Sequence, residues 1–305
     1  MFFRLIVLTI LSLSITLISC NQVIIKKEPK VSTEVKTLPA IPEYMYFAGE
    51  KIILKDWDIR ERLDREILVN TYFQSATSLI IKRSNRWFPM LERLLKKSNI
   101  HSDFKYLAVI ESALVEQATS QVGAQGFWQF MPFTAKEFNL TINDEVDERL
   151  DVTKSTKAAC AYLKTAKEKL NDWVLTAAAY NRGIHGVLQD KTWQKAKSYF
   201  DLEQNEETAR YVFRILAIKL ILENPDKYGF NIPVEHRYPS LKTTSIQIKQ
   251  SISNLAEWSI SKGINIKILR KLNPWIKTTR LTIKNKYYTL LLPLNTENLK
   301  PYHNY

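Results

Sequence analysis

A carboxylic acid, Glu111, lies near the end of an apolar helical stretch, shortly before a segment rich in glycine, amide and aromatic residues. That segment contains Gly123, Gly126, Trp128, Gln129 and Met131. Four of the seven glycines fall in residues 123–126 and 183–186, and glycine is favoured where backbone bends sharply or approaches a ligand. A helical carboxyl group beside such a loop is typical of a cleft for a polar, ring-shaped ligand such as a glycan.

Cleavage of a glycosidic bond requires a proton donor for the leaving oxygen while an oxocarbenium-like centre develops. Glu111 lies among the apolar residues Leu107, Ile110 and Leu114 of the same stretch. Apolar surroundings raise the pKa of a carboxyl group, so we expect Glu111 to stay protonated near neutral pH. Residue type alone leaves a second interpretation open, in which Glu111 is a solvated carboxylate on a helix face.

Four segments occur together in the order found in one enzyme family. They are Glu111-Ser112, Ser120–Pro132 (SQVGAQGFWQFMP), Ala179–Gly183 (AYNRG) and Glu207–Val212 (ETARYV). Together they resemble the lytic murein transglycosylases with a goose-type lysozyme-like fold (glycoside hydrolase family 23), most closely the membrane-bound type D group. The resemblance covers roughly residues 50–235. Phe127 stands where leucine is more usual, which we expect to reshape the cleft wall without disabling it.

The resemblance implies a peptidoglycan lytic transglycosylase in which Glu111 acts first as acid and then as base. Glu111 would protonate the oxygen between N-acetylmuramic acid and N-acetylglucosamine. Its carboxylate would then take the proton of the muramyl C6 hydroxyl, which closes a 1,6-anhydro ring. No cofactor is implied. The family's substrate-binding positions correspond to Ser120, Gln129, Tyr180, Asn181 and Glu207.

Tyr180 of that set is expected to orient either Glu111 or the substrate acetamide. Outside the set, Tyr211 is expected either to pack or to bind sugar. Two alternative functions also remain open. A hydrolytic muramidase of the same fold would need a second, water-activating carboxylate. A non-catalytic peptidoglycan-binding lipoprotein would need no catalytic carboxylate. The four histidines have no metal-ligand spacing, so no metal site is expected.

The sequence predicts a mainly α protein: a lysozyme-like helical domain over residues 46–236, followed by a small βααβ domain over residues 240–296. Apolar residues recur at helical spacing almost throughout residues 57–226, interrupted only after Gly123. Further helices are predicted over residues 155–170, 172–181 and 206–223. Ser102-Asp103 is predicted to cap the helix that carries Glu111, and Cys160 to be a buried, unpaired thiol.

The C-terminal domain is predicted as strand 243–250, helices 254–262 and 265–272, and strand 286–293. It resembles a LysM domain, a module that grips glycans containing N-acetylglucosamine. The usual Gly-Asp-Ser/Thr-Leu turn reads Lys249-Gln-Ser-Ile252 in this chain. Glycan binding and a purely structural role are therefore both left open for this domain.

Residues 1–19 are predicted to be a lipoprotein signal peptide, because Arg4 and an apolar run precede the lipobox-like sequence Leu17-Ile18-Ser19-Cys20. Cys20 would be lipidated, and residues 20–45, which contain prolines and mixed charges, would form a flexible tether. Asn21 follows the cysteine, where aspartate is associated with inner-membrane retention. We therefore expect a monomer anchored through lipid to the bacterial outer membrane and facing the periplasm.

Net charge is +13, and residues 237–305 hold 12 Lys and Arg against 2 Asp and Glu. Such a surface favours anionic polymers. In an exported lipoprotein these would be cell-wall polymer or lipid headgroups and not nucleic acid, with a merely solvated surface as the alternative. Peptidoglycan glycan strands are the expected partner.

Overall fold

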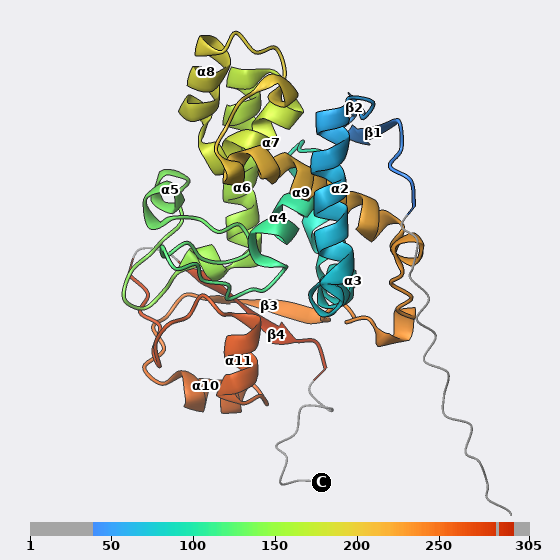
Figure 1. The fold of residues 1–305 in the computed structure, drawn as a ribbon. Coiled ribbons are helices and arrows are strands. Elements are labelled where there is room, and N and C mark those ends of the chain that lie inside the picture. The colour runs from blue at the N-terminus through green and yellow to red at the C-terminus, as the bar shows by residue number, and fades with distance from the viewer. Residues whose placement is uncertain (1–38, 285–286, 296–305) are drawn as a thin grey trace, which may run out of the picture. The chain divides into compact units, whose positions relative to one another are not determined.

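The computed structural model describes residues 39–284 and 287–295 (Figure 1). The predicted signal peptide, Cys20 and most of the predicted tether lie outside these residues. A short antiparallel hairpin opens the described chain, formed by β1 (Tyr44–Phe47) and β2 (Glu50–Ile53). β1 therefore begins inside the segment expected to be a tether, and its Met45 is buried in the core.

The domain after this hairpin is helical (Figure 1). Its α-helices are α2 (Trp57–Tyr72), α3 (Gln74–Lys97), α4 (Lys105–Ser112), α5 (Pro132–Glu137), α6 (Val152–Leu170), α7 (Trp173–Arg182), α8 (Ile184–Trp193) and α9 (Glu206–Glu223). Short polar side chains accept backbone N–H groups at the starts of four of them and so fix where those helices begin. These caps are Asp56, Asp151, Asp172 and Asn205.

The helical core is built around α9, which contacts α2, α4 and α7. Phe213, Leu216 and Ala217 of this helix are fully buried. Burial of this kind removes apolar surface from water and is the main stabilising contribution to such a core. Cys160 on α6 is a buried free thiol, as predicted.

The structure corrects two details of the predicted helical pattern. Helix α4 stops because Ala113 and Leu114 adopt left-handed backbone, with φ of 49° and 57°. From there to α5 the backbone forms isolated β-bridges within the segment. A second segment without an α-helix, which holds another bridge and a 3₁₀ turn at Glu148–Leu150, separates α5 from α6. The chain is thus interrupted over a longer stretch than the sequence indicated.

The second correction concerns the start of α4. Its N-terminus follows a 3₁₀ turn at Ser102–Phe104, where His101 Nδ1 accepts the N–H of Asp103 at 3.2 Å. The buried Asp103 carboxylate instead accepts Ala48 N–H at 2.8 Å and pairs with Lys219 at 2.9 Å. A buried carboxylate needs a charged partner, and this requirement outweighs the local capping preference.

The C-terminal domain has the predicted β-α-α-β order (Figure 1). β3 (Thr243–Ile248) pairs antiparallel with β4 (Tyr288–Pro293), and α10 (Leu255–Ser261) and α11 (Ile266–Leu272) lie between them in sequence. Its core includes Leu255, Leu269, Leu281 and Leu290, all fully buried. Asn273, also fully buried, bonds both backbone groups of Leu291 and so ties the end of α11 to β4.

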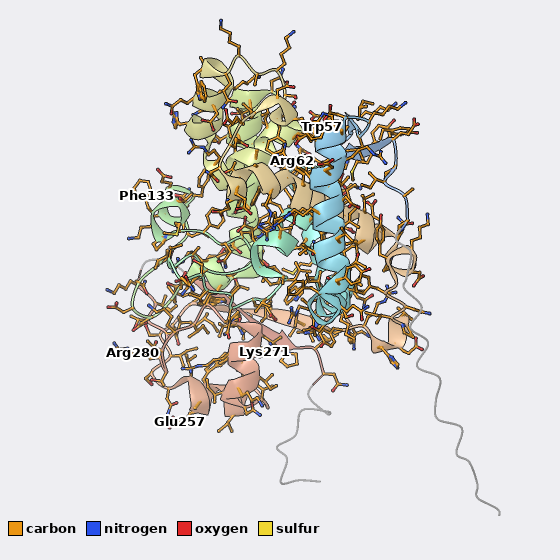
Figure 2. All side chains as sticks on the ribbon, viewed as in Figure 1. Trp57, Arg62, Phe133, Glu257, Lys271 and Arg280 are labelled. Atoms are coloured by element: carbon orange, nitrogen blue, oxygen red, sulfur yellow. The ribbon has the colours of Figure 1, made fainter. Side chains whose placement is uncertain are left out.

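The two domains share an edge at residues 145–147. Val146 is buried in the core of the small domain, although it belongs in sequence to the helical domain. Glu145 accepts hydrogen bonds from Arg280 Nε and Thr282 N, both at 2.8 Å. Figure 2 shows Arg280 projecting from the small domain, which also carries the labelled Lys271 and Glu257. This junction ties the small domain to the segment between α5 and α6.

No helix within residues 39–284 and 287–295 combines the length and the apolar character needed to cross a bilayer.

Candidate active site

Glu111 is brought to the site by α4, a short helix packed between α3 and α9. Tyr106, Leu107, Ala108 and Val109 of this helix are buried. Because the helix ends one residue after Glu111, the carboxyl group lies at the point where the chain turns into the glycine-rich segment. Leu107 and Leu114, two of the apolar residues expected around Glu111, are fully buried.

The Glu111 carboxyl group is desolvated and contacted from α9. Burial raises its pKa to about 7. A hydrogen bond from the Tyr211 hydroxyl to Oε1 and the charge of Arg214 lower this pKa, and the charge of Glu207 raises it slightly. The net effect keeps a large protonated fraction near neutral pH, as the sequence predicted, and this is what a general acid requires.

A cavity of about 430 Å³ lies against Glu111. Its wall combines apolar side chains with hydroxyl, amide and guanidinium groups, a mixture that suits a polar ligand with apolar ring faces. The lining residues are Asn70, Ile80, Val109, Ile110, Glu111, Ser112, Ala113, Ala118, Thr119, Ser120, Gln129, Arg214 and Ile218.

The glycine-rich wall of the cavity is held by Arg149. Its Nη1 donates to the carbonyls of Gly123 at 2.8 Å and Phe130 at 3.1 Å, while Asp147 pairs with Nη2 at 2.7 Å. Gly126 packs directly on the Arg149 backbone, where a Cβ would lie 2.1 Å from the carbonyl oxygen. Glycine is therefore required at this position for the close approach of two backbone segments.

Ser120 and Gln129 both line the cavity together with Glu111. The Ser120 hydroxyl accepts the N–H of Ala124 at 3.0 Å and so also closes a local turn. Gln129 Nε2 donates to the carbonyls of Gly126 at 2.8 Å and Ala118 at 3.1 Å, and its backbone is left-handed with φ of 46°. Such a conformation in a residue other than glycine is strained and often marks a functional position.

Asn181, near the end of α7, and Glu207, in the first turn of α9, form a linked pair. Asn181 Nδ2 donates to Glu207 Oε1 at 3.0 Å, and Asn181 Oδ1 accepts from Thr208 Oγ1 at 2.9 Å. Glu207 is exposed, and its charge raises the pKa of Glu111. Neither residue lines the cavity described above.

Tyr180 does not make the hydrogen bond to Glu111 that was one of its two expected roles. Its hydroxyl donates to the carbonyl of Trp128 at 2.8 Å, so Tyr180 supports the glycine-rich segment without lining the cavity. Tyr211 makes the bond to Glu111 instead. The sequence could not separate packing from function for Tyr211, because both require a tyrosine on the inner face of the same helix.

Arg214 is a site residue that the sequence did not indicate. It follows Tyr211 by three positions on α9 and therefore lies on the same face of the helix. The signal was present in that spacing, but a basic residue on a long helix is usually solvated. Among the described residues, no group of three or more His, Cys, Asp or Glu side chains is arranged to hold a metal ion.

Two segments of the chain match known families. Residues 89–202 match the transglycosylase SLT domain, and residues 244–296 match the soluble lytic transglycosylase C-terminal LysM-like domain. The first match contains Glu111, Ser120, Gln129, Tyr180 and Asn181, whereas Glu207, Tyr211 and Arg214 lie beyond its end.

Among curated proteins, the chain is 27% identical to membrane-bound lytic murein transglycosylase D of Escherichia coli K12. That alignment covers 79% of this chain and 53% of the relative, so the chain spans about half of the relative's length. A putative tributyltin chloride resistance protein of Alteromonas is 29% identical, over 39% of this chain and 58% of its own.

Among solved structures, lytic transglycosylase Slt of Pseudomonas aeruginosa, as an inactive variant, matches with 25% identity and a TM-score of 0.37. That match covers 49% of this chain and 26% of the other. The 70 kDa soluble lytic transglycosylase of Escherichia coli matches with 22% identity and the same TM-score, over 50% of this chain and 27% of the other. From the family matches and the observed architecture, the chain combines a mainly helical, lysozyme-like transglycosylase SLT domain with a C-terminal βααβ LysM-like domain.

Proposed function

We propose that this protein is a peptidoglycan lytic transglycosylase in which Glu111 is the single catalytic acid and base. The observation that carries the proposal is a desolvated Glu111 in the wall of a polar cavity, inside the segment that matches the SLT domain. The name of the Escherichia coli relative, a lytic murein transglycosylase, supports the same substrate.

In the first step, protonated Glu111 gives its proton to the glycosidic oxygen between N-acetylmuramic acid and N-acetylglucosamine. The bond from that oxygen to the muramyl C1 breaks, and positive charge develops at C1. Glu111 is then a carboxylate, which Tyr211 stabilises through its hydroxyl hydrogen bond and Arg214 through its charge. Proton donation from a positioned side chain contributes roughly 10²–10⁴ in rate.

In the second step, the muramyl C6 hydroxyl attacks C1 of the same sugar. Its proton passes to the Glu111 carboxylate, which restores the acid, and a 1,6-anhydro ring closes without consuming water. A hydrolase would need another carboxylate to activate water. The charge of Glu207 reaches Glu111, but the Glu207 carboxylate already accepts the Asn181 amide, which favours a supporting role for it.

The remaining predicted site residues bind or position the glycan in this proposal. Ser120 and Gln129 contact the sugar from the glycine-rich wall, where both line the cavity. Asn181, held by Glu207 and Thr208, presents an amide suited to hydroxyl and acetamide groups. Tyr180 supports the wall through the Trp128 carbonyl.

We further propose that the protein is a monomer held at the bacterial outer membrane through lipid on Cys20, facing the periplasm. The lipid anchor is supported by the lipobox-like sequence before Cys20 and by the membrane-bound name of the Escherichia coli relative, and the outer membrane by Asn21 after the cysteine. Radiolabelled palmitate should be incorporated by the wild-type chain in cells and not by Cys20→Ala. Equal incorporation in both would reject Cys20 as the anchor.

The catalytic proposal is tested by digestion of purified sacculi followed by mass spectrometry. The wild type should release fragments with anhydromuramic ends, and Glu111→Gln should release none while still binding sacculi. Glu168→Gln, which changes an exposed carboxylate on α6 in the same way, serves as the control and should digest normally. Reducing ends alone would show a muramidase, and normal digestion by Glu111→Gln would remove Glu111 from the mechanism.

A further inference from the structure

Arg214 is a cation in the cavity wall that has no ion-pair partner among the described residues. Other arginines of the helical domain are engaged in ion pairs with carboxylates, among them Arg62, Arg65, Arg149, Arg182 and Arg210. Within the described part of the chain, Arg214 has no carboxylate oxygen at ion-pair distance. Among the same residues its side chain makes one hydrogen bond, from Nη2 to the carbonyl of Ile110 at 3.0 Å.

A guanidinium carries five N–H donors in a planar fork that matches a carboxylate. One donor of Arg214 meets the Ile110 carbonyl, and the partly buried side chain lines the same cavity as Glu111 and Asn70. Glu111 is substantially protonated in the active state, so it does not balance this charge before the first step. A ligand carboxylate would meet an oriented and partly desolvated cation, which is where charge pairing is strong.

We propose that Arg214 forms a carboxylate-binding subsite beside Glu111, which selects the acidic muramyl side of the substrate. This inference rests on the proposed function. Every N-acetylmuramic acid carries a lactyl ether, whose carboxyl group is either free or joined to a peptide with carboxylates of its own. N-acetylglucosamine carries none. The subsite would therefore favour peptidoglycan over a neutral glycan of the same backbone.

A second arginine provides a matched control. Arg83 on α3 donates from Nη1 to the carbonyl of Ala113 at 3.2 Å, and so holds the other end of the turn that contains Glu111. Arg83 does not line the cavity. Loss of either guanidinium removes one hydrogen bond to this turn, but only loss of Arg214 removes a cation from the proposed subsite.

The test compares two preparations of peptidoglycan glycan strands: native strands, and strands whose carboxyl groups have been converted to neutral methylamides. We expect the wild type to lose roughly 10- to 100-fold in kcat/KM on the neutral strands, the range that a charged hydrogen bond corresponds to. Arg214→Gln should lose a similar factor on native strands and show little further loss on neutral ones. Arg214→Lys should retain part of the preference.

Arg83→Gln should keep the full wild-type preference for native strands, whatever its absolute rate. The proposal is overturned if Arg214→Gln still prefers native strands as strongly as the wild type does, because Arg214 would then act only by positioning Glu111. An equal wild-type rate on both preparations would overturn it as well. If the wild type cleaves neither preparation, the proposed function is refuted, and the subsite with it.

Discussion

Replacing Glu111 by glutamine should stabilise the protein in alkaline solution while it removes activity. Burial raises the pKa of Glu111 from 4.5 to about 7 in the folded state. Between these pH values the folded state binds more protons than the unfolded state, so the contribution of Glu111 to stability is lost as pH rises through about 7. At about 1.4 kcal/mol per pKa unit, the loss amounts to roughly 3 kcal/mol once ionisation is complete.

Glutamine stays neutral at every pH and can still accept the Tyr211 hydroxyl through its amide oxygen. The stability difference between Glu111→Gln and the wild type should therefore grow in favour of the variant by about 3 kcal/mol between pH 4 and pH 9. For a protein of this size, each kcal/mol shifts the midpoint of thermal unfolding by roughly 2–4 °C.

Thermal unfolding followed by circular dichroism, for both proteins at several pH values, measures this difference. Glu168→Gln controls for the change in net charge, since it replaces an exposed carboxylate on another helix. A midpoint difference between Glu111→Gln and the wild type that stays constant from pH 4 to pH 9 would refute the reasoning. It would mean that ionising Glu111 costs no more in the folded chain than in the unfolded one.

Four further substitutions probe the site and the small domain. Tyr211→Phe removes a hydrogen bond that lowers the pKa of Glu111, so the alkaline limb of the profile of kcat/KM against pH should move to higher pH; a fixed limb would exclude the contact. Gly126→Ala should cost more than about 3 kcal/mol in urea unfolding, because its Cβ would meet the Arg149 carbonyl. Gly123→Ala, also at positive φ but with open space around it, should cost only about 1 kcal/mol, and equal costs would rule out the clash. Asn273→Ala leaves the backbone groups of Leu291 without their partner and should lower stability by about 1–3 kcal/mol; no change in tryptophan-monitored unfolding would contradict this.

Much of the fold could be predicted because its signals are local. The periodicity of α6, α7 and α9 and the β-α-α-β order of the small domain are written into adjacent residues, and the structure confirms them. The hairpin of β1 and β2 was not predicted, since two four-residue strands carry little pattern. The interruption after α4 was underestimated, because its backbone groups pair with residues on other parts of the segment.

In the site, too, the local features could be predicted and the contacts between distant segments could not. The sequence identified Glu111 and its glycine-rich wall, because the residue types and their order carry that information along a continuous stretch of chain. It offered Tyr180 as a partner of the acid, left Tyr211 between packing and sugar binding, and did not single out Arg214. In the structure, Tyr211 and Arg214 contact the end of α4. Those contacts join α4 to α9, about a hundred positions apart in sequence.

What the sequence determined by itself was the chemistry available: one carboxyl group among apolar neighbours, a bending loop and a second, basic domain. Only the tertiary structure decided which hydroxyl reaches that carboxyl group and which cation enters the cavity. The physical reason is that desolvation and hydrogen bonding depend on distances between segments that the packing of α9 on α4 sets. The same packing gives Glu111 its raised pKa, because burial is the largest cause of that shift.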